Sequence, residues 1–266
     1  MSMRWTLFAF GLAAPALTPT AAPAATPGFH VQYRAPHNAD YSTYRDELKR
    51  ERFLESVTAD LDATLKLPAP LTVELAECGR STARHSDAAH TVTLCYELVD
   101  AIVALSQSDR PAPERAQARF SGTLTYVLLA EIGAALVSEY ALTLPLDSTA
   151  AQAGSEFATL SLASAERDGE PIGAGALELF TLALANRSSG FEYPTDHGLD
   201  RLRLGDMACI LYGNAPSNHA SVVSGGLLPE ARAPRCAEEV VDLAKRWDGY
   251  LKPHSRPGAT PAAAAP

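Results

Sequence analysis

The sequence predicts an α+β domain that is mostly helical, with a small β-sheet near the N-terminus. Apolar and polar residues alternate, as in half-buried strands, at 29–34, 71–75 and 90–94. After residue 96, apolar residues recur instead with the spacing of buried helices. Because the strands come first and the helices follow, this order argues against a series of alternating βαβ units.

The helices are predicted from apolar repeats, and their ends from Pro, Gly and Asn. One helix is expected over 41–67, where Pro68 ends the repeat. The segment 79–89 is expected to be a loop between two strands. Further helices are expected over 96–108, 114–140, 149–167, 173–186, 199–211 and 237–251.

The two ends of the chain lack the composition of a folded domain. Residues 1–25 are typical of a signal peptide, with a basic start at Arg4 and an apolar run from Trp5 to Leu17. That run is shorter than the roughly 20 apolar residues that span a bilayer, so we expect cleavage and no stable membrane insertion. Residues 256–266, rich in Ala and Pro, are expected to be a disordered tail. Residues 26–255 are therefore expected to form one globular domain.

The four cysteines indicate disulfide bonds. An exported chain meets an oxidising compartment, so we expect a periplasmic or secreted protein. Of the three possible pairings, neighbouring pairs are favoured, Cys78–Cys95 and Cys209–Cys236. The alternative, a four-cysteine zinc site, would need closely spaced CxxC pairs, which the chain lacks. The net charge of −9 argues against nucleic acid as a partner.

One predicted core helix contains an acidic residue and a glycine that need an explanation. Glu131 lies on the apolar stripe of the helix over 114–140, and Gly133 follows it. A buried carboxylate is costly unless it is paired or protonated. Glu131 therefore has three interpretations: a remnant of a lost site, a base in some other chemistry, or a structural acid paired across the core.

This helix resembles the zinc-binding helix of an exported bacterial family described as metallopeptidases. The family's helix reads roughly F-V-L-L-H-E-L-G-H-A-L, in which two histidines hold Zn²⁺ and the glutamate activates water. Here Glu131 and Gly133 match, but the histidine positions are occupied by Ala130 and Ala134. The resemblance implies a zincin-like helix core with zinc as cofactor, and its ligands are missing.

The resemblance covers most of residues 29–254. The motifs around both cysteine pairs are similar, as are Asp196-His197-Gly198-Leu199 with Arg203, and Trp247 with Pro253-His254. The family also carries an acidic segment, E-E-D-x-A-D, that supplies a further ligand. The corresponding stretch here, 149–157, has only Glu156, aligned with a neutral position. With about three protein ligands needed, we expect no metal and no cofactor.

The functional prediction is a non-catalytic relative of this family that binds a protein or peptide partner. A second hypothesis keeps catalysis, with Glu131 and His197 as an acid–base pair, which requires the two side chains to be in hydrogen-bond reach. A third is a structural envelope protein without a pocket. His85 and His90, five residues apart, are a weaker candidate for a surface metal site.

Overall fold

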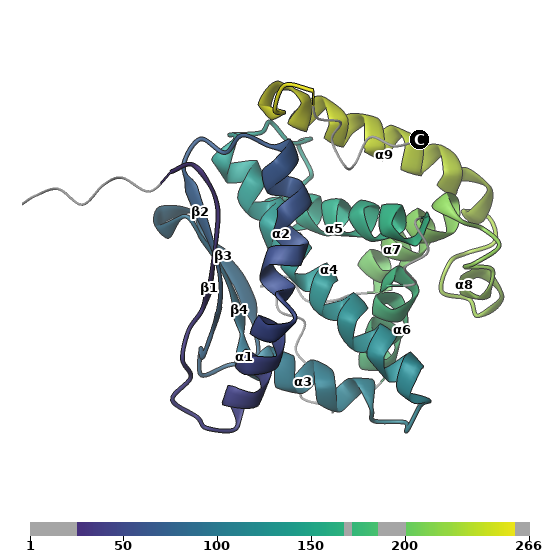
Figure 1. Ribbon diagram of the computed structural model, residues 1–266. Helices are drawn as coiled ribbons and strands as arrows, with labels where there is room; N and C mark the ends of the chain where they lie inside the picture. Colours follow the sequence, from purple (N-terminus) through teal and green to yellow (C-terminus); the bar gives the residue numbers. More distant parts are fainter. Residues whose placement is uncertain (1–25, 168–171, 186–200, 259–266) are drawn as a thin grey trace, which may run out of the picture.

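The structure is a computed structural model that describes residues 26–167, 172–185 and 201–258 (Figure 1). It confirms a mostly helical α+β fold with a four-stranded sheet at its N-terminal side. The strands are β1 (Gly28–Tyr33), β2 (Pro70–Ala76), β3 (Ala83–Ser86) and β4 (Thr91–Cys95), in the order β1-β2-β4-β3. β2 is parallel to both β1 and β4, whereas β3 is antiparallel to β4 and forms an edge.

The connection from β1 to β2 differs from the sequence prediction. Two helices, α1 (Tyr41–Arg50) and α2 (Phe53–Thr64), replace the single helix expected over 41–67. They are separated at Arg52, whose φ of 54° is left-handed and ends a helical repeat. Together they join two parallel strands, so this part of the chain is a single βαβ unit within an otherwise α+β fold.

β3 was also missed, because it lies inside the segment predicted to be a loop. It has four residues, Ala83-Arg84-His85-Ser86, and their composition is not typical of a strand. Pairing with β4 over the register Ala83–Leu94 to Ser86–Thr91 holds it in the sheet. The consequence for the site is that His85 projects from a fixed edge strand.

The long helix α4 (Pro113–Glu139) is the centre of the molecule (Figure 1). It packs on β3 and β4 along one side and on α5 (Ala150–Arg167) and α6 (Ile172–Ala185) along the other. Among the described residues it is the one helix long and apolar enough to cross a membrane. However, 78% of its most apolar stretch is buried inside this protein, as expected for the core helix of a globular domain.

The other helices surround this centre. α3 (Tyr96–Ser106) directly follows β4, and α7 (Arg201–Asn214), the short α8 (Ser221–Ser224) and α9 (Cys236–Leu251) complete the described chain. α9 packs on α5 and α7, and its buried Trp247 lies against Phe157 with 4.9 Å between ring centroids.

Both predicted disulfides are present. Cys78–Cys95 joins the segment after β2 to the end of β4, and Cys209–Cys236 joins α7 to the start of α9. They are consistent with an oxidising, extracytoplasmic environment. The predicted signal peptide, 1–25, lies outside the described residues, and so does most of the predicted tail, from 259 onward.

Candidate functional site

The candidate site lies in the second half of α4, at the stretch that resembles a zinc-binding helix. Strands β3 and β4 and helices α5 and α6 all pack on α4. Its side chains are therefore apolar on nearly all sides. Ala130, Glu131 and Ala134 are all buried, with 5%, 6% and 2% of their surface exposed. The two alanines are one turn apart and share a face of the helix.

Glu131 has a partner from the edge strand. Its Oε2 atom accepts a hydrogen bond from Nδ1 of His85, at 3.2 Å. The other ring nitrogen of His85, Nε2, lies 3.6 Å from a carboxylate oxygen of the exposed Asp87. The hydrogen bond to Glu131 raises the pKa of His85 above its ordinary value, and burial of the ring opposes that rise. The buried carboxylate is therefore paired across the contact between β3 and α4.

The second loop histidine binds a different carboxylate. Nδ1 of His90, which follows β3, lies 2.6 Å from Oε1 of Glu139 at the end of α4. Eight residues separate Glu131 from Glu139, which is about 12 Å along a helix. His85 and His90 thus hold two points of α4, and their rings do not converge on one ion.

The glycine next to the site has a packing role. A Cβ atom at Gly133 would lie 2.9 Å from Cβ of Phe157 and 3.0 Å from Cα of Gly154, both on α5. A Cβ atom at Gly154 would in turn lie 2.1 Å from the carbonyl oxygen of Ala130 and 3.1 Å from Cβ of Ala134. The two helices therefore approach each other at paired glycines, and α5 lies directly against the face that carries the alanines.

The acid in the 149–157 segment is directed to another helix. Glu156 lies on α5, where Nη2 of Arg246 on α9 donates to its Oε2 atom at 2.9 Å. Burial raises the pKa of Glu156, and Arg246 opposes that rise. The residue thus joins α5 to α9.

These residues do not fit a zinc ion. Alanine has no donor atom, so positions 130, 131 and 134 offer a single carboxylate, whereas a catalytic zinc site has about three protein ligands. In the described part of the chain, one group of three potential ligands lies close together: Cys78, Cys95 and Glu97. Its cysteines are already joined in a disulfide, and Glu97 accepts hydrogen bonds from the backbone of Cys78 and Gly79.

A family model described as "Putative metallopeptidase" matches residues 33–251, which is most of the chain. The chain belongs to this family. Neither the comparison with curated proteins nor that with solved structures gave a match.

Sequence reasoning singled out residues of this helix but not the partner of its acid. It identified Glu131, Ala130 and Ala134, and the structure places all three on one buried stretch of α4. It considered His85 only as a surface ligand and missed its contact with Glu131, which spans 46 residues. His197, the other half of the predicted acid–base pair, lies outside the described residues, so that pair stays a prediction.

Proposed function

We propose that this protein is a non-catalytic member of the metallopeptidase family, exported from the cytoplasm, that acts by binding a protein or peptide partner. The observation that carries the proposal is the pair of buried methyl groups at Ala130 and Ala134. They occupy the two helix positions at which the family's sequence pattern has histidines. Without nitrogen donors there, the 130–134 stretch of α4 supplies one carboxylate to a metal, which is too few for catalysis.

The surroundings of Glu131 support the same conclusion. In a metallopeptidase helix of this type the glutamate acts on metal-bound water. Here its carboxylate is engaged by His85, and α5 lies against the neighbouring face of the helix. The two disulfides support export, because such bonds persist in oxidising compartments.

Metal content and peptidase activity of the purified, disulfide-bonded protein test the proposal. After dialysis against buffer with micromolar zinc, we expect far less than one zinc per chain by elemental analysis. We also expect no cleavage of casein or of a random peptide library, with or without added zinc. Stoichiometric zinc, or cleavage that a chelator and Glu131→Gln both abolish, would overturn the proposal.

Placing histidines at positions 130 and 134 tests whether the protein lacks only the zinc ligands or also the space for the ion. We expect Ala130→His/Ala134→His to bind no stoichiometric zinc and to lower the free energy of unfolding by about 1–3 kcal/mol per site, since both methyl groups are buried. Ala104→His, at an exposed position of α3, is the matched control and should change stability by less than about 0.5 kcal/mol. One-to-one zinc uptake by the double variant would show that the metal cleft is still open.

A further inference from the structure

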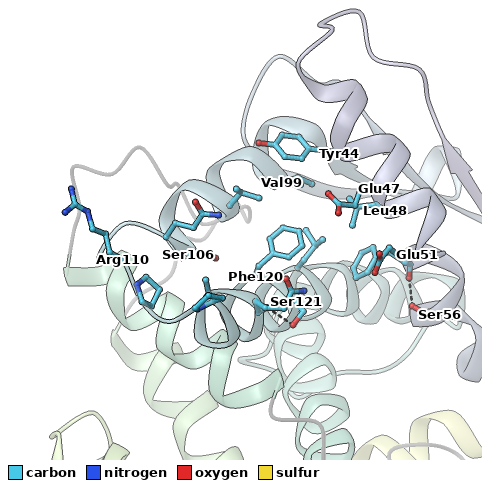
Figure 2. Close-up of a pocket in the computed structure, with 18 residues that line it drawn as sticks. Tyr44, Glu47, Leu48, Glu51, Ser56, Val99, Ser106, Arg110, Phe120 and Ser121 are labelled. Carbon is cyan, nitrogen blue, oxygen red and sulfur yellow. Dashed lines mark hydrogen bonds between the residues drawn. The ribbon is translucent and has the colours of Figure 1, made fainter.

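A groove of about 980 Å³ lies between α1, the start of α2, α3 and the first half of α4 (Figure 2). It does not include Glu131 or either alanine of the candidate site. Its volume is near the upper end of the range for ligand pockets, so several side chains of a partner can enter it.

The walls of the groove are apolar and only partly covered. Phe53, Val103 and Phe120 are half-buried and line the groove, with the buried Leu48 and Leu124 beneath them. The two phenylalanines come from different elements, α2 and α4, and pack on the main core. An apolar side chain placed between them would remove their remaining exposed surface from water.

A hydroxyl group in the groove lacks a partner. Ser106, the last residue of α3, is 1% exposed, and its Oγ atom makes no hydrogen bond to the described residues. Ser121, which lines the same groove, instead donates to the carbonyl of Gln117 at 2.9 Å. Because buried hydroxyl groups are nearly always hydrogen-bonded, the Oγ of Ser106 is available to donate to an acceptor that enters the groove.

The backbone that carries Ser106 is held firmly. Arg119 of α4, itself 2% exposed, donates to the carbonyl oxygen of Ser106 at 3.2 Å and to Asp109 at 2.6 Å. Glu178 of α6 binds the same guanidinium at 2.7 Å. This network fixes the end of α3, so the hydroxyl is positioned before any ligand arrives.

Charge gives the groove a direction. Glu47 and Glu51, one turn apart, lie at its α1 side, and Arg110 lies at the opposite end (Figure 2). Both acids are exposed, and their partner in the structure is Arg50, at 3.3 and 3.4 Å. Such exposed ion pairs are weak, so a ligand's cation can replace Arg50 beside them. The net charge of −9 attracts cationic ligands to the surface in general.

We propose that this groove binds a peptide segment in which apolar side chains are flanked by lysine or arginine. The apolar side chains lie between Phe53 and Phe120, a backbone carbonyl of the peptide accepts from Oγ of Ser106, and a basic side chain binds Glu47 and Glu51. This inference rests on the proposed function, a partner-binding protein, and gives the partner its chemistry.

Fluorescence anisotropy with short labelled peptides tests it. The probes carry Leu-Phe flanked by lysines, and matched probes carry glutamates in place of the lysines. We expect the lysine probes to bind at least tenfold more tightly, with the difference shrinking as salt rises. Equal affinities, or no binding of the lysine probes, would overturn the proposal.

Variants place the binding in the groove. Glu47→Gln/Glu51→Gln should weaken binding about tenfold, and Ser106→Ala about threefold, while the circular dichroism spectrum and thermal midpoint show that both remain folded. Glu238→Gln/Asp242→Asn removes two exposed acids one turn apart on α9, of which Asp242 also has a basic partner, Lys245, and is the matched control. If the α9 variant lost as much affinity as the α1 variant, the peptide would be attracted by the overall negative charge, and the proposal that it binds in the groove would be wrong.

The same samples distinguish the two proposals. Mass spectrometry of the probes after incubation reports cleavage, which would overturn the non-catalytic function whatever the groove does. Binding that is intact in the groove variants, with probes left uncut, would overturn the groove and leave the partner-binding function standing.

Discussion

Glu131 is a buried carboxylate that connects two elements of the fold, β3 and α4. An unpaired charge at 6% exposure would be costly, and the imidazole of His85 at 3.2 Å offsets that cost. The pair also ties the edge strand β3 to the central helix. Its contribution to stability therefore depends on whether His85 is protonated.

The first prediction is that Glu131→Gln destabilises the protein in a pH-dependent way. Glu131 raises the pKa of His85, so the protonated imidazole is stabilised in the folded state. That contribution is fully present below the unfolded-state pKa of about 6.5 and is lost as the pH rises through the folded-state pKa. In urea unfolding we expect wild type to exceed the variant by about 2 kcal/mol at pH 5.5, and by less at pH 9.

The control for this prediction is a histidine on the surface. His37→Gln removes an imidazole that is 97% exposed and 3.6 Å from Glu77, so its effect should be small at both pH values. A difference between wild type and Glu131→Gln that is constant with pH, or that grows as pH rises, would show that His85 is not the partner that matters.

At this scale the sequence identifies which residues need an explanation better than it identifies their partners. Glu131 and Gly133 stand out because neither belongs in an apolar core helix. Their partners, His85 and Gly154, lie in segments whose local patterns say nothing of α4. The unpaired hydroxyl of Ser106 is equally invisible, because satisfaction of a hydrogen bond is a property of the packed structure.

At the scale of elements, the contact between α4 and α5 decides whether a metal cleft is open. Backbone touches backbone there, because both helices have glycine at the crossing, Gly133 and Gly154. Glycines allow helix axes to approach more closely than larger residues do. The approach brings α5 against the alanine face of α4 and leaves little space beside Ala134.

The second prediction is that Gly154→Ala separates these helices at a large cost. The added methyl group would lie 2.1 Å from the carbonyl oxygen of Ala130, which is backbone and cannot rotate away. We expect a loss of about 3 kcal/mol in the free energy of unfolding, in the upper range for overpacking, measured by urea unfolding. The neighbouring Ala134 contact should loosen with it.

Gly249→Ala is the matched control for that substitution. Gly249 is an exposed residue of α9, and a Cβ atom there would meet nothing within 4 Å. Alanine should therefore stabilise the protein by about 0.5–1 kcal/mol through its better helix propensity. If Gly154→Ala proved as harmless as Gly249→Ala, the close crossing of α4 and α5 would be wrong.

The sequence predicted the elements that have a clear apolar repeat, and it missed those whose conformation is not encoded in their own residues. The helix expected over 114–140 is confirmed as α4, since a long apolar repeat needs no partner to be recognised. The break between α1 and α2 was missed because Arg52 adopts a left-handed φ, and no glycine or proline marks this position in the sequence. β3 was missed because its pairing with β4 decides its conformation.

At the scale of the whole molecule, each disulfide secures a different half of the fold. Cys78–Cys95 closes the β2–β4 part of the sheet, and Cys209–Cys236 holds α7 to α9 on the helical side. Such bonds stabilise mainly by restricting the unfolded chain, and the effect grows slowly with the number of residues enclosed. The sequence separations are 17 and 27, so the two bonds should differ only slightly.

The last prediction follows from that difference. Cys78→Ala/Cys95→Ala should lower the free energy of unfolding by about 3 kcal/mol, and Cys209→Ala/Cys236→Ala by about 0.4 kcal/mol more, since the second loop is longer. Urea unfolding at pH 7 measures both losses. Alanine is used in place of serine because Cys95 and Cys236 are fully buried, and a serine hydroxyl there would be buried without a hydrogen bond. Wild type under a strong reductant is the control and should lose about the sum, most of the stability of a typical domain. A larger loss for the shorter loop would show that native contacts at the β2–β4 end, and not the entropy of the unfolded chain, determine what these bonds contribute.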